Sequence, residues 1–530
     1  MKLEIDNIFF AVCLCLPFLF TPKFLQLHFL GGPIGTELVI WPVLLMYAYT
    51  FSSFVKGKRE FYRFKYFGYF IVVYFIYSIL SLLHGFSIYP YWNLIFNGPV
   101  EQIEKLPKVL SFLQIHHIGI SKKFLTEFWL TFRLIKAIFL DCFYLFFFSY
   151  IVFCWYRKNP KQGFSILNKS ITLIIWGICF YSIFELLYFF GFDFGKNVLI
   201  TINPVLHSIK ENFNWWPPLL WDTARVRSFF PEPSQFGMYA TFALPFLFTN
   251  ILNGEHKNTN LLQLFLLSLL LFLSLSKTSN MLLLFALFLE VLYVLVRKNK
   301  DDYKKMAVII AVIIAAFGAN ILCLSNYSVD KYNHPLDSRI ASTQSKSTKL
   351  VSSYVNDNVT GVVNPNAGSN NARFSLMRSE IKIFMEHPVL GVGTGLRSAY
   401  SANNLMKEHN NNEEVNMWVR LQEKEGVLKS GVPSTCEFTN RLSETGLIGM
   451  VIYFFPIFYL FKIIWIKRKN LSKNNKQNNM EICIYISLFC ILLSGFSGML
   501  NTTHCYWVSL GLAYAFALYR PNEKELGEKK

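Results

Sequence analysis

The chain has 530 residues, of which 53% are hydrophobic and only 16% are charged, whereas a soluble protein usually carries about 25% charged residues. The apolar residues gather in blocks of roughly 18 to 25, long enough for helices that cross about 30 Å of hydrocarbon. This composition excludes an ordinary soluble domain. The net charge of +18 does not indicate nucleic-acid binding, because no basic stripe with interleaved aromatic residues occurs.

Twelve candidate membrane-spanning segments follow one another along the chain, and we expect them to be helical because a helix satisfies its own backbone groups in lipid. They cover residues 8–29, 36–55, 66–85, 128–154, 169–191, 234–252, 261–278, 280–297, 306–325, 438–465, 481–500 and 503–519. The first resembles a signal peptide but lacks a basic start and a small-residue cleavage site, so we interpret it as an uncleaved span. The predicted fold class is an all-α polytopic membrane protein with about twelve transmembrane helices.

Short segments rich in Lys and Arg follow several spans, which is the positive-inside pattern that sets orientation. With these segments in the cytoplasm, helices one to nine occupy residues 1–325 and include periplasmic loops 86–127 and 192–233. One large periplasmic loop, residues 326–437, separates helices nine and ten. Helices ten to twelve occupy 438–519, and 520–530 form a cytoplasmic tail. The lysines of loop 86–127 fit this orientation less well, and interfacial helices or a different helix count would explain them.

The first candidate site precedes the sixth span and contains Arg225, Arg227, Glu232 and Ser234. Two arginines two residues apart point to one side of an extended strand, and guanidinium groups suit phosphate oxygens. Prolines on both sides of Glu232 stiffen its backbone. The alternative is structural: Glu232 and Ser234 cap the next helix, and the arginines reach lipid headgroups.

The second candidate site lies in the large loop. Residues 373–386 have helical spacing, with Arg373 and Arg378 in this helix and Pro388 ending it. The glycine-rich run 391–395 is expected to form a turn, whose N–H groups either bind an anion or serve only the turn. A third motif, residues 437–449, opens the tenth span, where its glycines favour close helix packing.

The fourth span contains Arg133, Lys136 and Asp141. Charged residues inside a membrane usually face a partner or a cavity, although Arg133 and Lys136 lie near the outer end, where reaching the lipid headgroups is the alternative. His409 lies in a polar loop and is either solvated or a base. The ten histidines are scattered and His116 has no set of metal ligands at useful spacing, so we predict no metal and no cofactor.

The ordered set of motifs resembles the O-antigen ligase and O-antigen polymerase superfamily of bacterial envelope glycosyltransferases. An arginine-rich stretch with Glu-Pro-Ser precedes a span, a Ser-Lys-Thr turn at 276–278 joins two spans, and the large outer loop carries Arg373, Arg378 and residues 387–393. The Glu-Thr-Gly-Leu-Ile-Gly run at 444–449 then enters the next span. The resemblance covers about residues 210–465 and implies a GT-C-like fold in the inner membrane, with the active site facing the periplasm.

The resemblance implies an undecaprenyl-diphosphate-linked glycan donor, a glycan acceptor, no metal, and as partners membrane lipid, a chain-length regulator and a flippase. On this basis Arg225, Arg227, Arg373 and Arg378 are expected to hold the leaving diphosphate by charge-assisted hydrogen bonds. Glu232 is the first candidate for the base and His409 the second. In these terms Glu232, Arg227 and Arg378 are catalytic, and the substrate-binding residues are Arg225, Arg373, Arg133, Lys136 and His409.

Ligases of this family usually carry His followed by Asn or Ser about eleven residues before the first glycine of the Thr-Gly-Leu-x-Gly motif. Those positions are Thr435 and Cys436 here. This departure favours polymerisation of repeat units over ligation to lipid A core, which remains the alternative. A flippase of lipid-linked oligosaccharides is the alternative from another class, although inverted repeats and broken helices typical of transporters are not evident in the sequence.

Overall fold

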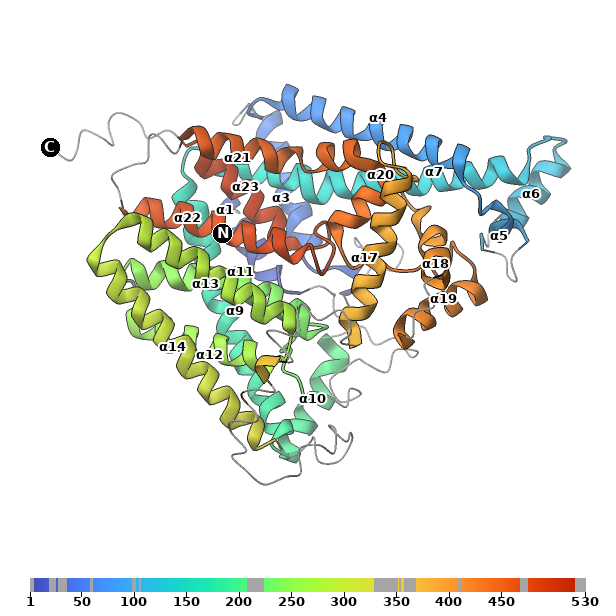
Figure 1. Cartoon of the computed structure of the whole chain (residues 1–530). Helices are drawn as coiled ribbons and strands as arrows, with labels where there is room; N and C mark the ends of the chain where they lie inside the picture. The colour runs from blue at the N-terminus through green and yellow to red at the C-terminus, as the bar shows by residue number, and fades with distance from the viewer. Residues whose placement is uncertain are drawn as a thin grey trace.

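The computed structural model describes the chain as a bundle of helices (Figure 1). The described residues are 4–18, 25–26, 36–57, 61–97, 102–103, 106–206, 224–327, 351, 354–356, 368–407, 412–467 and 475–519. Within these ranges the regular elements are all helices, which agrees with the predicted all-α class.

Most of the helices overlap the predicted spans, whereas α1 (Ile5–Cys15) coincides with only the first part of the span predicted over 8–29. The helices at the other spans are α3 (Ile40–Val55), α4 (Phe64–Ile88), α7 (Lys122–Leu140) continuing through the π-helix η2 (Asp141–Phe147) into α8 (Phe148–Tyr156), α9 (Pro160–Phe189), α11 (Pro233–Leu252), α12 (Lys257–Leu273), α13 (Lys277–Arg297), α14 (Lys300–Ser325), α20 (Glu437–Tyr453) with α21 (Phe455–Lys467), α22 (Asn475–Ser494) and α23 (His504–Ala517). In the described part of the chain, seven stretches are long and apolar enough to cross a membrane. The structure is consistent with a polytopic membrane protein, and the number twelve stays a prediction.

Local sequence signals set where several of these helices begin. The Ser121 hydroxyl accepts a hydrogen bond from Phe124 N at the start of α7, and the Asn299 side chain accepts one from Asp301 N at the start of α14. Ser276 caps α13 in the same way through Ser279 N. Residues 274–276 join α12 to α13, so of the predicted Ser-Lys-Thr turn only Ser276 lies in the link, and Lys277 and Thr278 already belong to α13. Such caps satisfy amide groups that the first helical turn leaves without partners.

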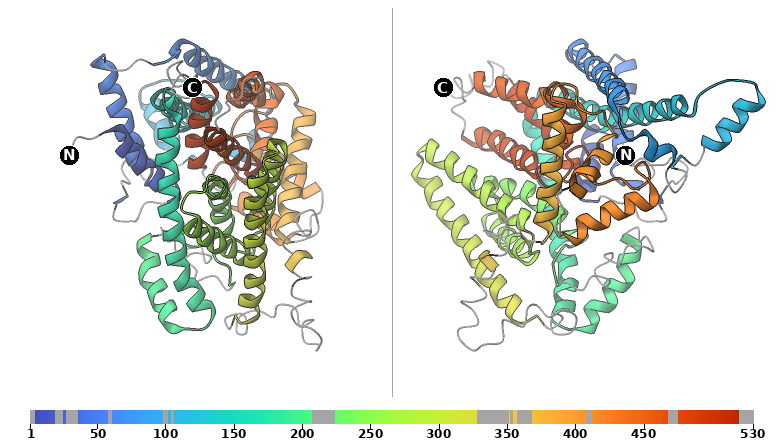
Figure 2. Two further views of the ribbon diagram at one scale, coloured as in Figure 1. Left: turned by 90° about the vertical axis from the view of Figure 1, so that its left-hand side faces the viewer. Right: turned by 45° about the vertical axis from the view of Figure 1, so that its right-hand side comes forward.

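The centre of the bundle is α11, in which seventeen of twenty residues are buried. It packs against α12, α13 and α22 (Figures 1 and 2). A Cβ atom at Gly237 would lie 1.5 Å from the Ser279 hydroxyl oxygen, so α11 and α13 approach closely at this glycine. A helix that is apolar on all sides is stable only when surrounded, and α11 therefore fixes the position of the segment before it, which ends in Glu232.

Shorter helices gather at one end of the bundle. In Figure 1, α5 (Trp92–Phe96) and α6 (Leu106–Ile115) lie at the same end as α18 (Arg397–Lys407) and α19 (Glu413–Glu425). The basic end of α21 at Lys467 lies at the opposite end. Helices from two of the segments assigned to the outer loops thus lie toward one side in this view, whereas α10 (Asp193–Leu206), from the third, lies at the bottom.

The helix predicted over 373–386 is confirmed as α17 (Gly368–Glu386), which ends two residues before Pro388. Its apolar residues Phe374, Met377, Ile381 and Phe384 share one face, as the spacing predicted, but that face is only partly buried: Ile381 is 44% exposed and the other three are half-buried. The opposite, buried face is formed by Ala372, Ser375, Leu376, Ser379, Glu380 and Ile383. A polar inner face on this helix indicates that it covers polar groups.

Candidate functional site

The glycine-rich turn and the start of the tenth predicted span form one structural unit. Three backbone hydrogen bonds join them: Val392 N to Ser443 O (3.0 Å), Gly393 N to Glu444 O (2.8 Å) and Leu447 N to Pro388 O (2.8 Å). These bonds are available because α20 is interrupted at Gly446, where φ is +66° and ψ is −173°. The second and third sequence motifs therefore interlock, and these N–H groups serve the turn rather than an anion.

Residues 77–85 of α4 hold this interlocked unit from a third side. The Tyr77 hydroxyl donates to Thr445 O at 2.7 Å, and the Ser81 hydroxyl donates to Leu390 O at 2.7 Å. A Cβ atom at Gly85 would lie 2.2 Å from Val392 O. Only glycine permits so close an approach, so the turn is clamped between α4 and α20.

A buried ion pair connects the outer segment to α20. Arg397 Nη1 lies 3.0 Å from Glu380 Oε1, and Glu380 is completely buried. The Thr439 hydroxyl donates to the other Glu380 oxygen, and Glu444 Oε1 accepts a hydrogen bond from Gly395 N at 3.0 Å. Burial raises the pKa of Glu380, while Arg397 and Thr439 oppose the shift. The carboxylate is thus held within protein, because its partners replace the water that burial removes.

A second buried network surrounds Asp141, at the start of the π-helix. Asp141 accepts hydrogen bonds from the Tyr74 hydroxyl (2.8 Å) and the Asn501 side chain (3.0 Å), and Arg441 Nη2 lies 3.5 Å away. Arg441 also pairs with Glu437 at 2.7 Å. The expectation that an intramembrane charge has a partner holds for Asp141. π-helical turns often occur at functional positions, and here the turn directs a carboxylate toward α20.

The arginine-rich segment before α11 places its two arginines differently. Arg227 is 1% exposed, its guanidinium donates to Pro231 O at 2.8 Å, and its backbone N–H points to Glu185 of α9. Arg225 is exposed. Burial lowers the pKa of Arg227 to about 10, with Glu185 opposing, so the group remains charged at neutral pH. The expected common orientation of the two arginines is not what the structure shows.

Glu232 lies where the first and second candidate sites meet. Glu232 is the N-cap residue of α11, as the capping alternative expected, although its side chain makes no capping hydrogen bond. Its carboxylate accepts a hydrogen bond from the Ser234 hydroxyl at 3.0 Å. Glu232 interacts electrostatically with Arg227 and with Glu414 of α19. Glu414 in turn interacts with Arg373 of α17. Charged residues from three separate segments therefore gather near the start of α11, and we call Arg227, Glu232, Arg373 and Glu414 the outer charged cluster.

The environment of Glu414 gives this cluster a titratable group. Partial burial raises the pKa of Glu414, Arg373 opposes the shift, and the like charge of Glu232 adds to it. A carboxylate with a raised pKa is a stronger base. The cluster thus combines cations that suit a diphosphate with carboxylates that can accept a proton.

Other predicted site residues lie apart from the cluster. Arg378 is exposed and five residues after Arg373, about 140° around α17 at 100° per residue. Arg133 and Lys136 are exposed on α7, and the Arg133 guanidinium lies 4.8 Å from the centre of the Trp129 ring. The alternative in which they reach lipid headgroups stays open. His409 lies outside the described residues.

Sequence reasoning missed five of these charged residues: Glu380, Arg397, Glu414, Glu437 and Arg441. Two carried a signal, because Glu437 and Arg441 stand four residues apart, which places opposite charges together on a helix. Arg397 follows the glycine-rich turn by two residues, whereas nothing local marks Glu380 or Glu414. For metals, no group of three His, Cys, Asp or Glu suited to an ion occurs in the ranges given above.

Fold and site together define a polytopic helical membrane protein with charged groups gathered between a central helix and an outer helical segment. Residues 262–421 match the family model described as O-antigen ligase. This segment runs from α12 into α19 and includes Arg373 and Glu414, so the chain carries the domain of the O-antigen ligase and polymerase superfamily, and the resemblance is confirmed. A comparison with curated proteins gives no match.

Proposed function

We propose that this protein joins undecaprenyl-diphosphate-linked oligosaccharide repeat units into O-antigen or another surface polysaccharide, on the periplasmic face of the inner membrane. The family match supports ligase- or polymerase-type glycosyl transfer to an acceptor and gives no support to the flippase alternative. The observation that carries the proposal is the outer charged cluster, in which two arginines and two carboxylates from three segments interact electrostatically.

In the proposed reaction, an acceptor hydroxyl attacks the anomeric carbon of the donor glycan while the bond from that carbon to the diphosphate oxygen breaks. The hydroxyl proton passes to Glu232, with Glu414 as the neighbouring carboxylate. The electron pair of the broken bond leaves with undecaprenyl diphosphate, whose charge Arg373 and Arg227 offset. Hydrogen bonds to charged groups contribute about 1.5–3 kcal/mol each, and a positioned base typically contributes about 10² to 10⁴ in rate.

The exposed arginines extend this arrangement. Arg225 directly precedes the cluster, and Arg378 lies on the same helix as Arg373. Because both side chains are exposed, we propose that they contact the donor only when it is bound, as parts of the diphosphate clamp. Transfer from the lipid-linked donor then requires no metal ion, since guanidinium groups supply the positive charge that offsets the leaving diphosphate.

Polymerisation is preferred over ligation to lipid A core because of residues 435 and 436. Where ligases usually carry His, this chain has Thr435, and the following Cys436 is buried at the start of α20. Neither side chain replaces an imidazole base. The ligase remains the second candidate because the matching family model is described by that name.

The deciding experiment examines surface and lipid-linked glycans in a deletion strain that carries variants of the protein. For a polymerase, we expect deletion to leave single repeat units, and Arg373→Ala to abolish elongation while the protein still inserts. Arg420→Ala is the matched control, because Arg420 is exposed on α19 and lies about 240° around that helix from Glu414. Accumulated polymer on undecaprenyl diphosphate would instead identify a ligase. A normal ladder from Arg373→Ala would remove the cluster from the mechanism.

The Glu232→Gln variant distinguishes the proposed role of Glu232 as the base from the role of the arginines that bind the diphosphate. Since glutamine keeps the size of the side chain but accepts no proton, we expect transfer to slow by about 10² or more while donor binding is retained. Donor binding can be followed by retention of the lipid-linked glycan on the purified variant. Unchanged elongation would exclude Glu232 as the proton acceptor.

A further inference from the structure

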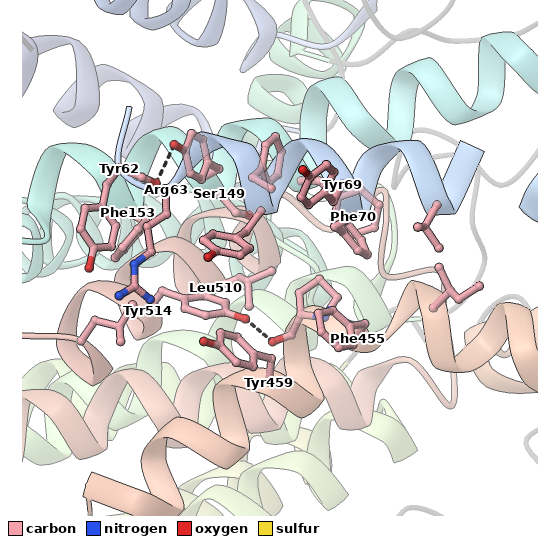
Figure 3. A pocket seen from close by; sticks show the side chains of 18 of the residues that line it. Tyr62, Arg63, Tyr69, Phe70, Ser149, Phe153, Phe455, Tyr459, Leu510 and Tyr514 are labelled. Carbon is pink, nitrogen blue, oxygen red and sulfur yellow. Dashed lines mark hydrogen bonds between the residues drawn. The ribbon is translucent and has the colours of Figure 1, made fainter. Parts of the chain in front are cut away.

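An aromatic groove of about 700 Å³ lies between α4 and α21, with α8 and α23 behind it (Figure 3). Six tyrosines and five phenylalanines line it, together with aliphatic residues, one serine and one arginine. The tyrosines and phenylalanines are Tyr62, Tyr66, Tyr69, Tyr150, Tyr459, Tyr514, Phe67, Phe70, Phe146, Phe153 and Phe455. The volume lies in the range that small molecules occupy in proteins, about 300–1,000 Å³.

The groove opens sideways from the helical bundle. Its floor is buried, with Phe146 and Leu510 at 4% and 2% exposure, whereas the rim residues Tyr66, Val73 and Phe455 are at least half exposed. The rim residues belong to the long apolar stretches of α4 and α20–α21, which we expect to face lipid. The space is therefore accessible from the bilayer.

Arg63 is the one charged residue that lines the groove. It stands immediately before α4 with a left-handed backbone (φ +53°), a conformation uncommon for a residue other than glycine. Figure 3 shows its side chain extending from α4 toward Tyr514. In the part of the chain that the structure describes, no ion pair involves Arg63. Its guanidinium and that of Arg157 both lie near the Tyr62 ring, 5.3 and 4.3 Å from the centre, so one end of the groove is basic.

We propose that this groove binds an anionic phospholipid, with the phosphate at Arg63 and an acyl chain along the aromatic lining. The lining residues of α4 run from Arg63 to Val73, which spans roughly 15 Å of helix. That length is about half of the 30 Å hydrocarbon core, so the groove matches a lipid of one leaflet. A long polyprenyl chain would exceed it.

The headgroup is the source of selectivity. An acyl chain leaves an equally apolar bilayer to enter the groove, so there is no hydrophobic driving force for its transfer. A charge-assisted hydrogen bond between a guanidinium and a phosphate is stronger than a neutral one, and arginine pairs with phosphate in a planar, forked geometry. Tyrosines also favour the membrane interface, which is where a lipid phosphate lies.

This site is separate from the proposed glycan-transfer site. Arg63 precedes Ser81, which contacts the glycine-rich turn, by 18 residues of α4, or roughly 27 Å of helix. The groove residues also lie outside residues 262–421, which match the family model. Lipid binding in the groove thus does not depend on the proposed transfer activity.

The test is native mass spectrometry of the full chain, purified in detergent and titrated with phosphatidylglycerol, phosphatidylethanolamine or undecaprenyl phosphate. We expect a preference for phosphatidylglycerol, which Arg63→Gln weakens by about tenfold and Arg63→Lys weakens less. Lys304→Gln is the matched control, since Lys304 is an exposed cation of another basic segment, at the start of α14. It should leave the preference unchanged.

A second variant keeps the test decisive if Arg63→Gln does not fold. Val451 lies on the rim of the groove at 46% exposure, and Val451→Trp should block the groove and reduce phosphatidylglycerol binding while Arg63 remains. If Arg63→Gln and Lys304→Gln reduced phosphatidylglycerol binding equally, the lipid would be attracted only by the overall positive charge of the protein surface, and the proposal would be overturned. An Arg63-dependent preference for undecaprenyl phosphate, or wild-type binding in Val451→Trp, would overturn it as well.

Discussion

Replacing Gly446 by alanine should disrupt the contact between α20 and the glycine-rich turn. Gly446 has φ +66° and ψ −173°, a region essentially restricted to glycine, where other residues cost about 1–3 kcal/mol. A Cβ atom there would also lie 2.2 Å from Val389 O and 2.4 Å from the Val389 carbonyl carbon. Overpacking against a fixed neighbour costs about 1–3 kcal/mol. Together, Gly446→Ala should destabilise the protein by about 2–6 kcal/mol.

Alanine variants at two other glycines serve as controls, because they distinguish the cost of backbone strain from the cost of a steric clash. Gly395 belongs to the same turn and has φ +86°, and Gly57 lies in a distant basic segment with φ +66°, but a Cβ atom at either meets nothing within 4 Å. Alanine at these positions carries only the conformational cost of about 1–2 kcal/mol. Gly391→Ala should resemble Gly446→Ala, because its Cβ would lie 2.4 Å from the Glu444 carbonyl atoms.

The assay is the melting temperature of each purified variant, followed by size-exclusion chromatography, together with the glycan ladder in cells. For domains of 150–250 residues, 1 kcal/mol changes Tm by about 2–4 °C, so the two collision variants should melt several degrees below the two controls and lose glycan transfer. Equal melting temperatures for Gly446→Ala and Gly395→Ala would refute the inferred close contact between the turn and the helix.

The remaining predictions concern charge and orientation. Arg373 holds the pKa of Glu414 down. Arg373→Gln should therefore raise that pKa, so Glu414 in the purified variant should become protonated at a higher pH on acidification, as followed by infrared difference spectroscopy with Glu414→Gln identifying the band. Arg373→Lys should keep the wild-type titration, and identical titrations for both variants would exclude this coupling. Arg397→Met leaves the buried Glu380 without its cation and should lower the free energy of unfolding by about 3–5 kcal/mol. Adding Glu380→Gln should partly restore Tm, and a double variant with no restored Tm would contradict the pairing. A tag within 356–371 should be accessible from the periplasm, and its protection in intact spheroplasts would contradict the assigned orientation.

The helices could be predicted because hydropathy is a local property. Apolar blocks of membrane length located α4, α11 and α13 within three residues of their bounds, since every backbone group in lipid requires a partner within the helix. In contrast, α9 and α14 begin nine and six residues before the predicted spans. The first predicted span was less accurate: 8–29 was expected, and the structure has α1 at Ile5–Cys15. Hydropathy likewise did not reveal the interruption at Gly446, because the break depends on contacts with the turn.

The site was predicted only in part, because charge pairing is decided by residues far apart in sequence. The role of Glu232 stays a prediction. Spacing alone placed Arg225 and Arg227 together, whereas Glu185 from α9 accompanies Arg227 in the interior. In α17, helical spacing located the element and its apolar face. It did not show that this face is only partly buried, because the polar groups that the other face covers come from α18 and α20.

The sequence by itself thus determined the class of protein, the helical segments and the family, since composition, hydropathy and short motifs are carried by neighbouring residues. Tertiary structure alone decided that the glycine-rich turn binds to the broken helix, that Glu414 joins Arg373 and Glu232, and that Arg63 faces an aromatic groove. Each of these depends on side chains brought together from segments tens to hundreds of residues apart. Packing of the helices, rather than any local preference, sets those distances.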